Sequence, residues 1–232
     1  DCPCLDLADE FHEVDIYDVQ GHLALAEQLR PRLCGVFTEG ADCEVTVAEV
    51  AEALDLPGIS VIAALNCKNK VFMRRAFDLI GLSPVEWQEV AWAEDITIPP
   101  PCIVKAVDNC ASRGNTVLSH GTRHYDVEMA YRLASRHSTT GRALVEELLT
   151  GPQQSVEILF DAEGGCLWLN IVDRIFDGVM ELGHVNPTRL STDEQGQLYE
   201  LTEAAAAAVG VDFGVFKADT IWTERGPRIL EV

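Results

Sequence analysis

Short apolar segments alternate with amphipathic ones over residues 1–64. The alternation predicts strands at 13–17, 34–38 and 60–62, and helices at 21–29 and 44–54. Strands that alternate with helices usually form βαβ units with a parallel sheet. We therefore expect an α/β domain that lacks its first strand and helix, since the sequence begins at Asp1 without an initiator Met and stops inside a strand.

The pattern after residue 64 predicts two mixed units joined by short connections. A helix at 68–80 ends at Gly81, and a strand at 85–92 precedes a proline-rich loop at 98–101. Strands at 102–106, 116–119 and 143–149 and a helix at 126–137 lead to the Gly151-Pro152 hinge. Strands at 155–160, 166–173 and 180–185 and a helix at 201–209 follow. We place domains at 1–84, 85–149 and 150–232, the last of them α+β.

The final stretch, residues 215–232, is predicted to form a β-hairpin. If Thr223 pairs with Pro227, Asp219 lies directly opposite Glu231. Opposed carboxylates, with Cβ atoms about 4.5–5.5 Å apart, repel each other, so this pairing favours a cation such as Mg²⁺ between them. Lys217 lies on the same face and could meet the phosphates of a nucleotide. A solvated hairpin face is the alternative, and a one-residue slip in register would move Glu231 to the other face.

The charge balance limits the class of partner. The chain has 38 acidic and 17 basic residues, a net charge of -21, which argues against nucleic acid. A nucleotide would have to be met by a few local cations. We find no run of 18 apolar residues and no signal-peptide pattern, and therefore expect a soluble cytoplasmic protein without a membrane partner.

The cysteine pattern argues against a metal or redox motif. The eight cysteines are scattered, only Cys2 and Cys4 are close together, and no C-x-x-C pair is present. We expect buried reduced thiols rather than a zinc site.

The order and spacing of these segments resemble the ATP-grasp superfamily, in particular its carboxylate-amine ligases. The resemblance covers nearly the whole chain and implies a truncated βαβ pre-ATP-grasp domain followed by a two-subdomain ATP-grasp fold. Asn69-Lys70 is similar to the start of the linking helix, where Lys70 would bind nucleotide. Lys105 closes an apolar strand and is similar to the lysine that contacts the α- and β-phosphates. A solvated lysine is the alternative for Lys70, and a water-exposed strand end for Lys105.

Two further segments are similar to parts of the family's nucleotide site. Residues 108–114 resemble the loop over the triphosphate, but they depart from the family by containing only one glycine. Ser112 and Arg113 would then supply side-chain hydrogen-bond donors to the phosphates. The alternative is that both are ordinary polar loop residues. Residues 145–149 resemble the hinge strand that reads adenine, with Glu146 toward the amino group and the backbone of Glu147 and Leu149 along the ring edge. Gln153 stands where the family has an acid for the ribose hydroxyls, and its amide can still hydrogen-bond a diol.

The resemblance also assigns the catalytic centre. Lys217 matches a basic phosphate contact, and Asp219 and Glu231 match two Mg²⁺ ligands, with a third expected just past Val232. Residues 181–187 are similar to a segment that faces the acceptor substrate. This similarity makes His184 and Arg189 candidates for substrate binding, with ordinary loop residues as the alternative.

The resemblance implies an ATP-dependent ligase that activates a carboxylate as an acyl phosphate and joins it to an amine, releasing ADP and phosphate. Lys217 and Arg113 would be catalytic, ATP and Mg²⁺ or Mn²⁺ would be bound, and the partners would be small-molecule carboxylates and amines. The alternative is a nucleotide-binding regulatory or non-catalytic ATP-grasp module, which the glycine-poor loop and Gln153 favour. Phosphoribosyl-type substrates, bicarbonate and amino acids all stay open, as does the oligomeric state, with a homodimer as one option.

Overall fold

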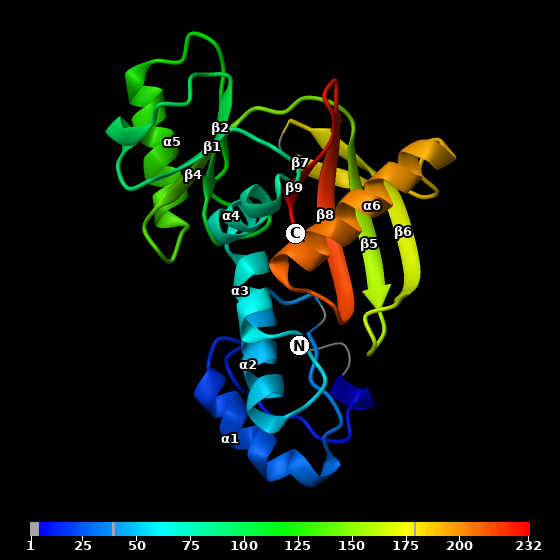
Figure 1. Ribbon diagram of the computed structural model, residues 1–232. Helices are drawn as coiled ribbons and strands as arrows, with labels where there is room; N and C mark the ends of the chain where they lie inside the picture. The colour runs from blue at the N-terminus through cyan, green and yellow to red at the C-terminus, as the bar shows by residue number, and fades with distance from the viewer. Residues whose placement is uncertain (1–4, 39, 179) are drawn as a thin grey trace. The chain divides into compact units, whose positions relative to one another are not determined.

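Figure 1 shows the computed structural model, which describes residues 5–38, 40–178 and 180–232. The chain divides into two compact units, residues 1–61 and 62–232. The domain boundaries at 84 and 149 stay predictions.

The first unit is helical. Helices α1 (Val19–Leu29) and α2 (Glu44–Leu54) pack together, with short 3-10 turns at Leu5–Leu7 and Arg30–Arg32. Asp18 caps α1 by accepting a hydrogen bond from the Gly21 backbone N–H. Ala26, Val50 and Leu54 form a small core.

The βαβ pattern predicted for this unit is wrong. Its described residues contain no strand, and the segments at 13–17 and 34–38 are turns or irregular backbone. The third predicted strand, 60–62, overlaps the start of helix α3 (Val61–Lys68). An extended segment becomes a strand only when another segment pairs with its N–H and C=O groups, and the apolar side chain of Phe37 is 85% exposed here.

The helix predicted at 68–80 is two helices, α3 and α4 (Lys70–Ile80), separated by Asn69. Asn69 has extended backbone angles, and its side chain accepts hydrogen bonds from the N–H groups of Val71 and Phe72. Such a cap starts a new helix. Gly81 ends α4 in the left-handed conformation, as predicted, with φ 67°. The buried face of α4 includes two charged residues, Lys70 and Arg74.

A four-stranded antiparallel sheet follows, in the order β1-β4-β2-β3. The strands are β1 (Trp87–Val90), β2 (Cys102–Ala106), β3 (Thr116–Leu118) and β4 (Ala143–Glu147). Helix α5 (His124–Arg136) lies along one side (Figure 1) and buries Ala130 and Ala134 against Val104 and Val145. The predicted strands and helix of this part are confirmed to within two or three residues at each end.

A five-stranded antiparallel sheet completes the second unit, in the order β7-β6-β5-β8-β9. Its strands are β5 (Gln153–Phe160), β6 (Cys166–Asp177), β7 (Met180–Val185), β8 (Gly214–Thr223) and β9 (Gly226–Glu231). Helix α6 (Thr192–Val209) packs on this sheet and contributes Leu198 to a core with Val156 and Ile171. It begins nine residues earlier than predicted because Ser191 and Glu194 form a capping box.

The terminal hairpin forms, but not in the predicted register. Thr223 pairs with Gly226, one residue short of the predicted partner. A β-bulge then adds Leu230 to β9, and beyond it Asp219 pairs with Glu231. The predicted carboxylate pair is therefore confirmed, although it depends on a bulge that the hydrophobic pattern does not reveal.

The described cysteines differ in burial. Cys102 is buried, and burial raises the pKa of its thiol, but Cys34 and Cys166 are exposed, so the expectation of uniformly buried thiols is wrong. Cys166 begins a strand directly after a surface turn. Cys2 and Cys4 lie outside the described residues. No helix within those residues is both long and apolar enough to cross a bilayer.

Candidate functional site

A cavity of about 280 Å³ in the second unit collects side chains from both sheets. Most of the predicted nucleotide and metal residues line it, namely Lys105, Ser112, Glu146, Glu147, Leu149, Gln153, Asp219 and Glu231. Its other lining residues include Arg174 and Phe176, which the sequence did not single out. The candidate site is therefore built around this cavity.

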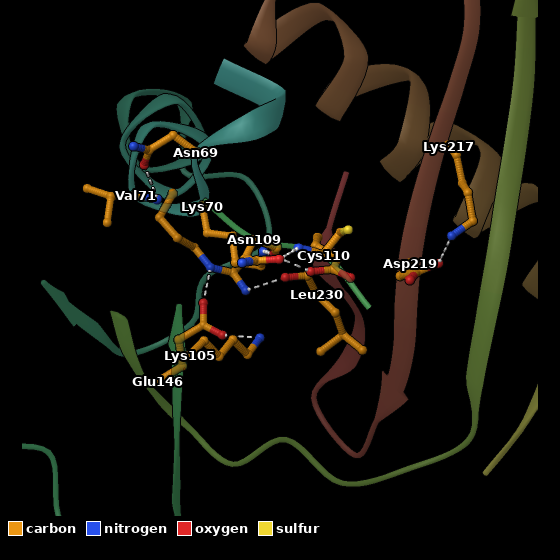
Figure 2. A network of polar contacts seen from close by, with 12 residues as sticks. Asn69, Lys70, Val71, Lys105, Asn109, Cys110, Glu146, Lys217, Asp219 and Leu230 are labelled. Carbon is orange, nitrogen blue, oxygen red and sulfur yellow. Dashed lines mark hydrogen bonds and ion pairs between the residues drawn. The ribbon is translucent and has the colours of Figure 1, made fainter. Parts of the chain in front are cut away.

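Lys105 is held on one wall of the cavity by Glu146. Its Nζ lies 2.6 Å from one oxygen of Glu146, and Arg74 Nε lies 2.5 Å from the other, with all three side chains almost fully buried. Figure 2 shows Lys105 and Glu146 side by side. Burial alone would raise the pKa of Glu146, but Arg74 and Lys105 outweigh burial and lower it to about 2. The carboxylate stays charged and fixes Lys105 in place.

Lys70 connects the loop at 108–114 to the terminal hairpin. Its Nζ donates a hydrogen bond to the backbone carbonyl of Asn109 at 2.6 Å (Figure 2) and lies 3.3 Å from a carboxylate oxygen of Glu231. The residue is only 6% exposed, so the solvated alternative is wrong for Lys70. Burial would raise the pKa of Glu231, but Lys70, followed by Lys105, outweighs burial and lowers it.

Asp219 receives two cations of its own. Lys217 Nζ lies 2.7 Å from one of its oxygens (Figure 2), and Arg174 Nη1 lies 2.9 Å from the other. Asp219 is 4% exposed. Arg174 also pairs with Glu181 at 2.8 Å and lies over the ring of Phe176, with 4.8 Å from its guanidinium carbon to the ring centre. Strand β6 also carries Asn170, Asp173 and Asp177, so no local pattern in the sequence singled out Arg174.

The opposed carboxylates fit a magnesium site. Mg²⁺ prefers oxygen ligands and is commonly held by one or two carboxylates together with phosphate oxygens. Asp219 and Glu231 supply such a pair, and no group of three or more His, Cys, Asp or Glu side chains in the described chain forms a separate metal cluster. The cations around the pair, Lys70, Lys217 and Arg174, are suited to the phosphates that would complete the site.

The loop at 108–114 folds back on itself. Ala111 and Ser112 both have left-handed backbone, with φ 54° and 56°, which costs free energy for residues that carry a Cβ. A Cβ at Gly114 would lie 3.1 Å from His137 and 3.2 Å from Ala134, which explains the one glycine of the loop. The structure places Ser112 on the cavity wall. Arg113 is exposed and donates to the Asn109 side chain at 3.4 Å, so it does not line the cavity.

The hinge residues Glu147, Leu149 and Gln153 also line the cavity. Glu147 pairs with Arg225 at 2.6 Å, and Gln153 accepts a hydrogen bond from Arg174 at 3.4 Å. Gly151 has φ 147°, and a Cβ there would lie 1.9 Å from the backbone oxygen of Trp222. The two chain segments therefore cross at a distance that only glycine permits.

Each predicted substrate residue is associated with Arg174. His184 pairs with Arg174 in the β6–β7 ladder, and its Nε2 lies 2.5 Å from Glu181. Arg189 is exposed and lines a second cavity of about 570 Å³, beside Asp173. Arg174 lines this second cavity too, so both predicted substrate residues are connected through Arg174 to Asp219.

The ATP-grasp domain model matches residues 98–232. The chain is 22% identical over 216 residues to the uncharacterized protein y4rH of Sinorhizobium fredii (strain NBRC 101917 / NGR234), a match that covers 86% of this chain and 43% of that protein.

Solved structures of similar fold include one ligase and two synthetases. An L-amino acid ligase from Bacillus licheniformis has a TM-score of 0.76 and 20% identity over 93% of this chain and 52% of its own. A phosphoribosylglycinamide synthetase from Anaerococcus prevotii has a TM-score of 0.73 and 20% identity, with 99% and 58% covered. The ADP complex of purK, an N5-carboxyaminoimidazole ribonucleotide synthetase, has a TM-score of 0.81 and 16% identity, with 99% and 60% covered. The chain thus spans between two fifths and three fifths of the proteins it matches.

Proposed function

Because the chain belongs to the ATP-grasp domain family, we propose that it carries the active site of an ATP-dependent ligase. The enzyme converts a carboxylate to an acyl phosphate, releasing ADP, and an amine then displaces phosphate to give an amide or peptide bond. One observation carries the proposal: Asp219 and Glu231 oppose each other across β8 and β9, in a cavity lined by cationic side chains.

The cations around the cavity suit a triphosphate. The net charge of the chain is -21, yet Lys70, Arg74, Lys105, Arg174 and Lys217 gather around this one site. In the proposed complex Lys105 and Lys70 bind the phosphates, while Lys217 binds the phosphoryl group that is transferred. Mg²⁺ held by Asp219 and Glu231 would neutralise charge on that group. No side-chain nucleophile is needed, because the substrate carboxylate attacks phosphorus.

The remaining predicted residues take supporting roles in this proposal. The Glu146 carboxylate already binds Arg74 and Lys105, so we do not assign it to the adenine amino group. The backbone of Glu147 and Leu149 meets the adenine edge instead. Gln153 meets the ribose. Ser112 and Arg113 cover the phosphates when the 85–149 domain closes as a lid. Arg113 would have to turn toward the cavity for this role.

The acceptor side of the site is proposed at β7. His184 and Glu181 lie beside Arg174, which itself contacts Asp219, so a substrate there would be next to the phosphoryl group. Arg189 would contact only a substrate long enough to reach the second cavity. Amino acids are a suitable first probe, because one protein of similar fold is an L-amino acid ligase.

An isotope experiment tests the proposed chemistry. The protein that contains this chain is incubated with ATP, Mg²⁺ and pooled L-amino acids labelled with ¹⁸O in the carboxylate. Attack on the γ-phosphorus leaves one carboxylate oxygen in the released phosphate, so ADP and ¹⁸O-labelled phosphate are expected. Asp219→Asn should reduce this transfer far more than it weakens ATP binding, because a metal ligand acts mainly on the charge that develops in the transition state.

The other outcomes separate the alternatives. Label in AMP, together with pyrophosphate, would refute the acyl phosphate and indicate adenylation. Binding of ATP without turnover on amino acids, bicarbonate or phosphoribosylamine would favour the non-catalytic nucleotide-binding module.

A further inference from the structure

Arg74 joins three elements of the second unit in its interior. Among the residues that the structure describes, it is the largest fully buried side chain, with 1% exposed. From α4 its Nε reaches Glu146 on β4 at 2.5 Å. Its Nη1 donates to the carbonyl of Ile229 at 3.0 Å, and its Nη2 donates to the carbonyl of Leu230 at 3.2 Å, both on β9.

The two carbonyl acceptors are consecutive in the chain. In a regular strand, successive carbonyl groups point to opposite edges, so one side chain cannot easily bond both. A bulge changes this pattern locally, and Leu230 is the residue that the bulge adds. Arg74 therefore binds β9 at the bulge itself. Ser83 supports the same edge of the strand, because its hydroxyl accepts a hydrogen bond from the Ile229 N–H at 2.7 Å.

The bulge decides where Glu231 points. Thr220 pairs with Ile229, so a ladder without the bulge would place Leu230 opposite Asp219 and turn Glu231 to the other face of the sheet. We infer that Arg74 is a positioning residue that stabilises the bulge and so keeps Glu231 on the same face as Asp219. This inference rests on the proposed function of the two carboxylates as metal ligands.

Charge balance alone does not explain an arginine at this position. Lys105 already neutralises Glu146, and a lysine at position 74 would add the same charge. The planar guanidinium, however, can hold a carboxylate and two carbonyls at once, which an ammonium group on a flexible stem does not reproduce. The expected consequence of a lysine at 74 is a loosened bulge within an otherwise intact unit.

The test compares Arg74→Lys with Arg75→Lys. Arg75 is the next residue of α4, and its side chain is exposed and paired with Glu89 at 2.9 Å, so it serves as the matched control. Mn²⁺ binding is titrated by electron paramagnetic resonance in the presence of ADP. Residues that orient metal ligands typically contribute about 10–100-fold to affinity. We expect a loss of about 10-fold or more in Mn²⁺ affinity for Arg74→Lys and none for Arg75→Lys.

Deletion of Leu230 provides a second test. It removes the bulge and moves the glutamate into the regular ladder position opposite Asp219. Arg74→Lys should then have no further effect on Mn²⁺ affinity. If Arg74→Lys alone does not fold, folding of the combined variant supports the inference, and continued failure overturns it.

The Mn²⁺ affinities of the parent and Arg74→Lys separate the positioning role of Arg74 from the metal site itself. Equal Mn²⁺ affinity in the parent and Arg74→Lys would overturn the positioning role and leave the metal site in place. Absence of Mn²⁺ binding in the parent would refute the metal site itself. In that case hydrogen exchange at the Leu230 and Glu231 amides without metal decides: faster exchange in Arg74→Lys supports stabilisation of the bulge, and unchanged exchange refutes it.

Discussion

Glu146→Gln isolates the ion pairs that hold Lys105. The change keeps the size of the side chain and leaves Arg74 and Lys105 as buried cations without their carboxylate. Folding lowers the pKa of Glu146 from 4.5 to about 2. At about 1.4 kcal/mol for each pH unit, this shift corresponds to about 3 kcal/mol of stability at pH 7. Removal of one partner from a buried pair typically costs a similar amount, about 3–5 kcal/mol.

The same shift fixes the pH dependence. Because folding lowers the pKa of Glu146, the carboxylate contributes fully above its ordinary pKa of 4.5, and the contribution is lost as the pH falls through about 2. Linkage gives about two fifths of the neutral-pH value at pH 3. The difference in free energy of unfolding between the parent and Glu146→Gln should therefore shrink as the solution is acidified.

Urea denaturation at pH 7 and at pH 3 measures both quantities. Glu147→Gln is the matched control: Glu147 is the next residue of β4 and pairs with Arg225 near the surface, so its loss should cost about 1 kcal/mol or less. If Glu146→Gln costs no more than Glu147→Gln, or if its cost does not change with pH, the carboxylate does not hold the buried cations as argued.

Two further predictions concern the hinge and the phosphate contact. Gly151→Ala should destabilise the protein by about 2 kcal/mol or more, because its Cβ would meet the Trp222 oxygen. The control Gly196→Ala, inside α6, should stabilise the protein by about 0.5–1 kcal/mol. Thermal unfolding that ranks the two variants the other way would contradict the close crossing of the two chain segments. Lys217→Met should leave the fold intact, because the Lys217 side chain is 49% exposed. It should reduce the increase in melting temperature that Mg-ATP causes. An unchanged increase would show that Lys217 does not contact the nucleotide.

Much of the second unit could be predicted because its strands carry a local signal. The segments at 102–106 and 180–185 match β2 and β7 residue for residue. The first of them contains Ile103 and Val104 directly after a proline-rich loop, which is the local signal of a strand. The prediction of strands in the first unit was wrong because a strand also requires a second segment to pair with, and the local sequence pattern does not reveal such a segment. The early start of α6 was missed because its first turns are polar, although the capping box of Ser191 and Glu194 is present in the sequence.

For the candidate site too, some residues could be predicted from the sequence and others could not. Lys105 and Asp219 stand out as charged residues in apolar strands, and the structure places both at the cavity. Arg74 and Arg174 were not predicted as site residues. The role of a buried arginine depends on its hydrogen-bond acceptors, and acceptors of these two residues are distant in the sequence. The Leu230 bulge was also not predictable from alternation, yet it determines which face Glu231 occupies.

The concentration of cations at one cavity of a strongly acidic chain has a consequence for the kinetics of binding. At physiological ionic strength, charges more than about 8 Å apart are largely screened. An approaching nucleotide therefore meets a chain of net charge -21 before it comes within range of Lys70 or Lys105. Added salt weakens that repulsion during the encounter more than it weakens the buried contacts, so nucleotide association should become faster as moderate salt is added.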